Sequence, residues 1–189
     1  MRVQIITGAE LLAHADALRS VYVSAFCAPP WDEDEERAVE FVGRLVHDVR
    51  RPGFTTALAF TGTGSLAGFA TAWTTRAPFP TDRCYPQAAA GLGTDRTLDW
   101  LVGAREIDEL AVRPAHHGTG LAGDLLSAVT ADAPEGRTWL LTSHRSPRAL
   151  AFYRRQGWAQ ATHPSPDGKG IVVLLGPRHP ARHLAPEPL

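Results

Sequence analysis

The feature that most constrains the fold is a strand pattern that runs into closely spaced glycines and then into a helix. Residues 105–112 (REIDELAV) are predicted to form a strand, and residues 118–132 turn through glycines into a segment with apolar residues at helical spacing. Residues 137–142 (RTWLLT) have the pattern of a further strand. Together the three segments predict a β-α-β unit, which requires a sheet with parallel neighbours and a helix on its face.

The rest of the chain alternates short strands and helices. Strands are expected at 2–6, 54–61, 66–75, 158–162 and 171–175, and helices at 11–25, 39–49, 98–102 and 147–156. Residues 76–97 are rich in Pro, Gly and Ala, so we expect a long connection there. The order predicts one three-layer α/β/α domain over residues 1–176, built on a mixed, mostly antiparallel sheet. Residues 177–189 form a Pro/His-rich C-terminal tail without a core pattern.

Composition excludes several classes of protein. The 189 residues are 44% hydrophobic and carry a formal net charge of −1, which disfavours a disordered acidic chain and a uniformly basic nucleic-acid binder. No apolar run is long enough for a membrane span, and Cys27 and Cys84 have neither disulfide-framework nor zinc-ligand spacing. Lys169 is the sole lysine among 19 basic residues, a bias typical of high-GC bacterial genomes. We therefore expect a soluble, cytoplasmic protein that binds no metal, membrane or nucleic acid.

The glycines at the helix entry have the chemistry of a phosphate cradle. Glycine lets the backbone turn tightly, and the first amides of a helix are free to bind an anion that the helix dipole favours. Gly118, Gly120 and Gly123 also fit the GxGxxG fingerprint of dinucleotide-binding proteins. That fingerprint needs an acid at the end of the next strand to hold a ribose, and residues 139–143 (WLLTS) contain none. A nicotinamide enzyme is therefore a less favoured alternative.

Two segments resemble motifs of the GNAT superfamily of acetyl-CoA-dependent N-acyltransferases. The family pattern Gln/Arg-x-x-Gly-x-Gly/Ala, after a strand ending in apolar-x-Val-x-Pro, matches residues 110–122 (LAVRPAHHGTGLA). His117 takes the first position in place of Gln or Arg. The pattern Asn-x-x-Ala-x-x-x-Tyr-x-x-x-Gly-Phe matches residues 146–158 (SPRALAFYRRQGW), with Ser146 for Asn and Trp158 for Phe. The resemblance implies a GNAT-like fold and acetyl transfer from acetyl-CoA, as co-substrate, to a primary amine.

The resemblance also implies roles for individual residues. The backbone of the strand end would pair with the pantetheine arm, the loop amides would hold the pyrophosphate, and the later helix would lie along the cofactor. Tyr153 would protonate the thiolate leaving group. The implied cofactor-binding residues are Leu110, Ala111, Val112, His117, Gly118, Thr119, Gly120, Leu121, Ala122, Ser146, Ala149 and Tyr153.

Three carboxylates in the strand before the glycines are candidates for the base that deprotonates the amine. In a flat strand Glu106 and Asp108 share one face and Glu109 points the other way, although a bulge would shift that count. Family members place an acid at sites equivalent to either Glu106 or Asp108, so these two rank equally and Glu109 ranks behind them. The alternative is that they only balance nearby arginines.

An acidic run from Asp32 to Glu36 follows Trp31. In the resembled family this segment helps to form the acceptor pocket, and carboxylates beside an aromatic ring suit a cationic amine. We therefore expect Trp31, Asp32 and Glu33 to contact the substrate. The alternative is that these acids only complement the dipole of the following helix.

The sequence leaves other questions open. The acceptor is expected to be a small-molecule or peptide amine, and the protein to be a monomer or homodimer. An idle acyl-CoA-binding module with the same fold is the alternative to an enzyme, because a fold does not fix a function.

Overall fold

The computed structural model describes residues 1–29, 31–166 and 170–185. The chain forms two compact units, Met1–Trp73 with Asp108–Ala131, and Thr74–Ile107 with Asp132–Leu189. Seven strands follow the order β1-β2-β3-β4-β5-β7-β6. Strand β4 (Arg105–Val112) begins in the second unit and ends in the first.

The first unit contains the N-terminal strands and three α-helices. Strand β2 pairs antiparallel with both β1 and β3, and the turn at 61–65 joins β2 to β3 as a hairpin. The elements are β1 (Arg2–Ile6), the 3-10 helix η1 (Gly8–His14), α1 (Ala15–Phe26), α2 (Glu35–Asp48), β2 (Thr55–Phe60), β3 (Leu66–Thr74), the 3-10 turn η3 (Pro114–His116) and α5 (Leu121–Thr130).

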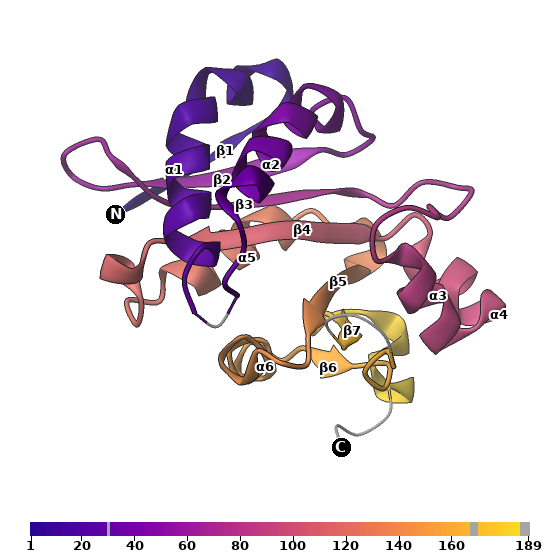
Figure 1. Ribbon diagram of the computed structural model, residues 1–189. Helices are drawn as coiled ribbons and strands as arrows, with labels where there is room; N and C mark the ends of the chain where they lie inside the picture. Colours follow the sequence, from indigo (N-terminus) through magenta and orange to yellow (C-terminus); the bar gives the residue numbers. More distant parts are fainter. Residues whose placement is uncertain (30, 167–169, 186–189) are drawn as a thin grey trace. The chain divides into compact units, whose positions relative to one another are not determined.

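Helices cover both faces of these strands, as Figure 1 shows. On one face the ring of Phe69 in β3 stacks on Phe41 of α2, with ring centroids 5.3 Å apart. The preceding residue, Gly68, faces α5, because a Cβ there would lie 3.1 Å from Leu125 Cδ1. Successive residues of a strand point to opposite faces, so α2 and α5 lie on opposite sides of β3. The first unit therefore has the expected three layers.

The second unit is built around β5. Strand β4 pairs parallel to β5 through Arg105–Ile107, whereas β5 with β7 and β6 with β7 pair antiparallel. The mixed, mostly antiparallel sheet of the sequence analysis is thereby confirmed. The elements are α3 (Tyr85–Leu92), α4 (Thr94–Arg96), the π-helical turn η2 (Thr97–Leu101), the 3-10 turn η4 (Pro134–Gly136), β5 (Thr138–Ser143), α6 (Pro147–Arg155), β6 (Ala159–Gln160), β7 (Ile171–Leu175) and the 3-10 helix η5 (Pro180–Leu184).

The expectation of a long unstructured connection over 76–97 was wrong. The segment contains α3, whose Tyr85, Ala88 and Leu92 enter the core of the second unit beside Trp139. These residues recur at helical spacing, but the alanines, glycines and prolines around them weaken the apolar contrast that marks an amphipathic helix.

The helix expected at 39–49 is α2, but two of its valines do not lie on its buried face. Val39 is 53% exposed and Val46 is 43% exposed. Ala38, Phe41 and Leu45 are buried in their place. Both sets have helical spacing, so periodicity locates the helix without deciding which of two apolar stripes is buried.

The C-terminal residues pack more closely than the sequence pattern indicates. His179 and Ala181 are buried in the second unit, where the His179 ring contacts the backbone of Trp100. The tail residues 186–189, and Lys169 with its neighbours 167–168, lie outside the described residues. The division into residues 1–176 and 177–189 stays a prediction.

Candidate active site

The glycine loop follows the end of β4 in the first unit. Arg113 fixes the start of the loop, because its Nε donates to Leu66 O at 2.9 Å and its Nη2 to Ser20 Oγ at 2.9 Å. Gly118 and Gly120 then adopt φ values of 77° and 88°, the left-handed region that favours glycine. Among the described residues, no atom lies within 4 Å of the position that a Cβ would take at either glycine.

His117 holds the glycine loop against the strand. Its Nε2 lies 2.9 Å from Val112 O, so the tautomer with a proton on Nε2 donates to that carbonyl. Downstream, Gly120 O accepts the amides of Gly123 and Asp124 and so begins α5. The amides before Gly123 have no acceptor in a preceding helical turn, and the positive end of the helix dipole lies at the same place. The loop therefore fits an anion such as the pyrophosphate of coenzyme A.

Glu106 is buried in the second unit and is hydrogen-bonded at both carboxylate oxygens. The Tyr85 hydroxyl donates to Oε1 at 2.6 Å, and the Thr75 hydroxyl donates to Oε2 at 3.2 Å. Thr75 Oγ1 in turn accepts from Trp139 Nε1 at 2.8 Å. The sequence pattern does not connect Thr75 or Tyr85 with this carboxylate. No local signal could have done so, because the two hydroxyls come from residues 31 and 21 positions away.

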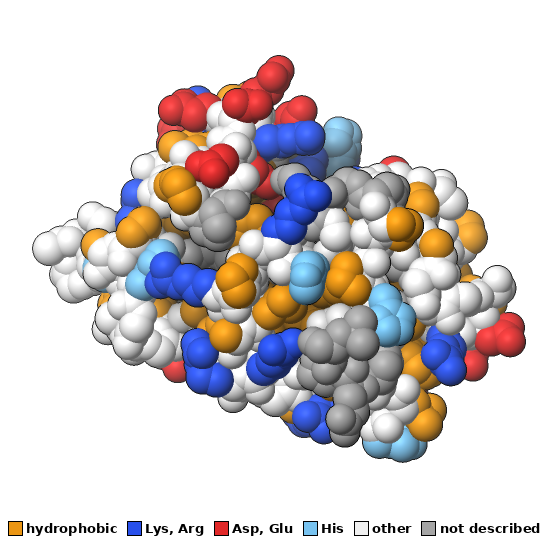
Figure 2. Space-filling view, turned by 60° about the horizontal axis from the view of Figure 1, so that its bottom comes forward, with side chains coloured by type: hydrophobic (Ala, Val, Ile, Leu, Met, Phe, Trp, Pro, Cys, Tyr) orange, Lys and Arg blue, Asp and Glu red, His pale blue; other side chains and the backbone are white. Residues whose placement is uncertain are grey.

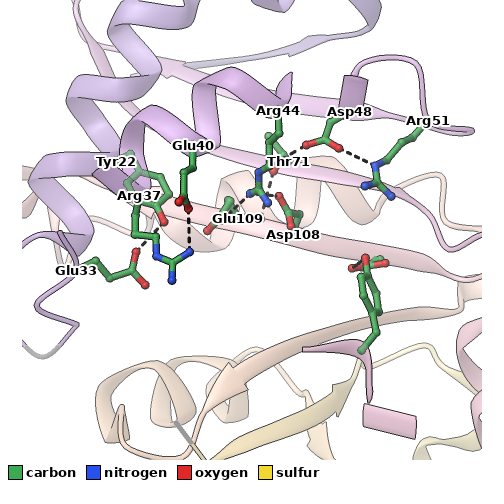
Figure 3. A network of polar contacts seen from close by, with 12 residues as sticks. Tyr22, Glu33, Arg37, Glu40, Arg44, Asp48, Arg51, Thr71, Asp108 and Glu109 are labelled. Atoms are coloured by element: carbon green, nitrogen blue, oxygen red, sulfur yellow. Dashed lines mark hydrogen bonds and ion pairs between the residues drawn. The ribbon is translucent and has the colours of Figure 1, made fainter. Parts of the chain in front are cut away.

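Asp108 and Glu109 lie in the first unit and share one cation. Arg44 Nη2 is 2.8 Å from Asp108 Oδ2 and 2.9 Å from Glu109 Oε1, and Figure 3 shows the Arg44 side chain pointing from α2 toward both. Arg44 Nε also lies 3.6 Å from Asp48, which Arg51 contacts at 2.7 Å. These two adjacent side chains reach one nitrogen, so they depart from the flat-strand alternation in which Glu109 would point away from Asp108.

The segment predicted to bind the acceptor lies between α1 and α2. The Tyr22 hydroxyl donates to Glu33 Oε2 at 2.7 Å, and the rings of Phe26 and Trp31 meet edge to face with centroids 6.0 Å apart. Burial of the Tyr22 phenol, with the negative charges of Glu109 and Glu33, raises its pKa and so keeps the hydroxyl a donor. Asp32 is exposed and has a φ of 46°. The segment is thus ordered by an aromatic pair and one partly buried hydrogen bond.

Helix α6 carries the second predicted set of residues. Ser146 caps it, since its Oγ accepts the Ala149 amide at 3.4 Å. The Tyr153 ring, half-buried, packs between Phe152 and Trp158 with centroid distances of 5.1 Å and 5.8 Å. The structure therefore joins Ser146 to Ala149, and places Tyr153 two turns further along the same helix.

The described residues include no group of three His, Cys, Asp or Glu side chains arranged to hold a metal ion. None of their helices combines the length and apolar character of a bilayer span. On the face drawn in Figure 2, arginine side chains stand apart among apolar and uncharged atoms. That spacing differs from the continuous basic stripe of nucleic-acid-binding proteins.

Comparisons with known proteins agree with this geometry. The sequence profile of the acetyltransferase (GNAT) domain matches residues 86–160. This range includes β4, the glycine loop, α5, β5, α6 and β6. By this match, the part of the chain from residue 86 to residue 160 is similar to a GNAT acetyltransferase domain. A search of curated protein sequences gave no match.

Several solved structures share the fold of this chain. A Corynebacterium glutamicum protein described as histone acetyltransferase HPA2 and related acetyltransferase is 17% identical, with a TM-score of 0.63 over 94% of this chain and 97% of that one. An acetyltransferase from Thermus thermophilus is 18% identical, with a TM-score of 0.59 over 93% and 96%. The ribosomal-protein-S18-alanine N-acetyltransferase from Escherichia coli is 17% identical, with a TM-score of 0.55 over 94% and 94%.

The domain match covers only part of the predicted site. It includes Glu106, Asp108, the glycine loop and Tyr153, whereas Trp31, Asp32 and Glu33 lie before its first residue. Recognition of the family by its two motifs is confirmed. The roles of the individual site residues stay predictions.

Proposed function

We propose that this protein transfers an acetyl group from acetyl-CoA to a primary amine of a small-molecule or peptide acceptor. The observation that carries the proposal is the strand-loop-helix of the first unit. There Gly118 and Gly120, both left-handed, precede the N-terminus of α5, and His117 fixes the loop to Val112. Acetyl-CoA would supply the thioester that is cleaved.

Within this proposal the first unit binds the cofactor. The backbone of Leu110, Ala111 and Val112 offers strand hydrogen bonds to the amide groups of pantetheine. The loop residues 117–122 (His117, Gly118, Thr119, Gly120, Leu121 and Ala122) offer amides to the pyrophosphate. Both contacts use the backbone, so side-chain differences from the family pattern are tolerated.

The reaction needs proton transfer at two atoms. A lysine-like amine has a pKa of about 10.4, so a base must remove a proton before its nitrogen can attack the thioester carbonyl. Glu106 or Asp108 would accept that proton, directly or through water. The departing sulfur needs a proton or a hydrogen bond, which the Tyr153 hydroxyl would supply from α6.

The acceptor would contact the segment after α1. Glu33 and Asp32 would attract a cationic amine, and the Trp31 ring would add a cation–π contact. Two structural relatives carry names that specify an acceptor or a bisubstrate complex: the S18-alanine N-acetyltransferase, and Naa20 of Chaetomium thermophilum, solved with a bisubstrate analogue. Peptide α-amines therefore belong in any acceptor screen.

The test is release of free CoA thiol from acetyl-CoA by the purified protein. Spermidine, an aminoglycoside and a short peptide with a free α-amine represent the main acceptor classes. Amine-dependent CoA release with a matching acetylated product supports the proposal. Binding of acetyl-CoA without turnover on any amine would favour the idle acyl-CoA-binding module. A rise in melting temperature with NAD and none with CoA would favour the nicotinamide enzyme.

A further inference from the structure

The buried network around Glu106 distinguishes the two candidate bases. We propose that Thr75 and Tyr85 are positioning residues that hold Glu106 as the general base and let it gain and lose a proton. This inference rests on the proposed acetyl transfer and deepens it. All the residues that carry it belong to the second unit.

Thr75 is held rigidly on both its backbone and its side chain. Its amide donates to Ala104 O at 2.9 Å, and its carbonyl accepts from Gly103 N at 2.8 Å. The indole Nε1 of Trp139 can only donate, so Thr75 Oγ1 must accept from it, which directs the hydroxyl proton toward Glu106 Oε2. The Trp139 contact therefore fixes the direction in which Thr75 donates.

Tyr85 holds the other carboxylate oxygen of Glu106. It is 2% exposed at the start of α3, and its ring meets Phe79 edge to face at 5.4 Å and Trp139 at 6.2 Å. With the ring fixed by these contacts, the hydroxyl has one position, 2.6 Å from Oε1. The carboxylate of Glu106 is thus oriented by two hydroxyls on two different segments of chain.

The chemistry of these partners favours Glu106 over Asp108 as the base. A hydroxyl can both donate and accept, so Thr75 or Tyr85 can accept a hydrogen bond once Glu106 carries a proton. A guanidinium has donors only, so a protonated Asp108 would lose its ion pair with Arg44, which lies 2.8 Å away. Protonation therefore costs Asp108 its ion pair, whereas protonated Glu106 can still form a hydrogen bond with a hydroxyl partner.

The proton balance of the step is simple. The ammonium N–H bond breaks, and its proton binds one oxygen of Glu106, directly or through water. The nitrogen keeps the electron pair and becomes neutral, and Glu106 becomes a neutral carboxylic acid. After transfer the carboxylic acid returns the proton to solvent, and the two hydroxyls donate to the carboxylate again.

The experiment compares variants that each remove one hydroxyl. Thr75→Val and Tyr85→Phe keep side-chain shape, and Thr75→Ser restores a hydroxyl. Thr97→Val is the matched control, because Thr97 is also a buried threonine of the second unit and its hydroxyl donates to Gly93 O instead of to Glu106. CoA release is measured with the fastest of the three probe amines, together with the melting temperature and the pH profile of kcat/KM.

We expect Thr75→Val and Tyr85→Phe to lower kcat by roughly 10- to 100-fold, a part of the 10²–10⁴ that a general base contributes. KM for acetyl-CoA should stay within about twofold. The acidic limb of the kcat/KM profile should move to higher pH, because hydroxyl donors stabilise a carboxylate against its acid. Thr75→Ser should recover most of kcat, and Thr97→Val should lose stability without losing kcat.

Two results would overturn the inference while acetyl transfer by the wild type still stands. One is a wild-type kcat and pH profile in both Thr75→Val and Tyr85→Phe. The other is a wild-type rate in Glu106→Gln with a large loss in Asp108→Asn. If Tyr85→Phe fails to fold, the kcat and pH profile of Thr75→Val, compared with those of Thr75→Ser, test the inference. A wild type that transfers acetyl to none of the amines refutes the proposed function instead.

Discussion

Arg44 Nη2 lies 2.8 Å from Asp108 and 2.9 Å from Glu109, so one guanidinium nitrogen serves two adjacent carboxylates of β4. The Asp108 side chain is 2% exposed. Arg44→Met should lower the free energy of unfolding by about 3–5 kcal/mol, because it removes a cation that contacts both carboxylates. Denaturant titration measures the change.

Arg37 is the control for this variant, since it pairs with Glu40 through side chains that are 63% and 56% exposed. Arg37→Met should cost about 0–1 kcal/mol. Adding Asp108→Asn to Arg44→Met should recover part of the lost stability. If Arg44→Met costs no more than Arg37→Met, the ion pairs of Arg44 contribute little to folding.

The glycine loop gives a prediction about cofactor binding. Gly120→Ala should abolish the rise in melting temperature that CoA produces, because a methyl group would obstruct close approach of pyrophosphate to the loop. Alanine at this φ of 88° should also cost about 1–2 kcal/mol of stability. Thermal unfolding with and without CoA separates the two effects.

Gly64 provides a matched variant in the β2–β3 turn of the same unit. Its φ is 84°, and among the described residues no atom lies within 4 Å of a Cβ built there. Gly64→Ala should therefore lose similar stability and keep the CoA response. If CoA raised the melting temperature of both variants equally, the glycine loop would not be part of the cofactor site.

Tyr153 is predicted to act on the leaving group. Tyr153→Phe keeps the ring contacts with Phe152 and Trp158 and removes the hydroxyl. We expect kcat to fall by roughly 10²-fold, within the usual range for an acid catalyst. The melting temperature and the affinity for acetyl-CoA should hardly change, because the stabilised charge arises only in the transition state. A fully active variant would leave Tyr153 a packing role alone.

Glu33 is predicted to attract a cationic acceptor. Glu33→Gln should raise KM for a positively charged amine several-fold at low salt, with a smaller effect at high salt. KM for acetyl-CoA should not change. Glu36→Gln removes one charge from an exposed position in the first turn of α2 and is the control. The same KM in both variants would show that the charge of Glu33 has no specific part in binding.

His179 should make stability depend on pH. Burial lowers its pKa from the ordinary value of 6.5, and its Nδ1 accepts the Ala181 amide, a bond that protonation would break. The unfolded chain then binds more protons than the folded chain below about pH 6.5. The stability that neutral His179 contributes is therefore complete above this pH and lost as the pH falls.

His179→Gln should flatten this dependence between about pH 7.5 and 5.5, measured as the midpoint of denaturant unfolding. His183, exposed in the same 3-10 helix, is the matched site, and His183→Gln should retain the wild-type slope. If His179→Gln kept the wild-type dependence of the unfolding midpoint on pH, other groups would be responsible for that dependence.

Local signals in the sequence predicted much of the fold. Ser146 before Pro147 marks the start of α6, and the left-handed Gly157 follows its end, because capping depends on neighbouring residues alone. The site was less predictable, since its contacts join residues far apart in the chain. Arg44 reaches Asp108 across 64 positions, and Tyr85 reaches Glu106 from a helix that the sequence pattern obscured. Contacts of this kind depend on how helices and strands pack in three dimensions. The spacing of apolar residues along the sequence does not specify them.

The division of the chain between the two units has a consequence for its synthesis. All residues of the first unit precede residue 132, whereas the second unit needs residues on both sides of that point. Because a ribosome makes the chain from its N-terminus, and domains generally fold as units, the first unit can fold while β5 is still being made. Until then Arg105–Ile107 has no β5 to pair with. Nascent chains stalled once α5 has left the ribosome should therefore contain a protease-resistant first unit and a cleavable segment between residues 74 and 107.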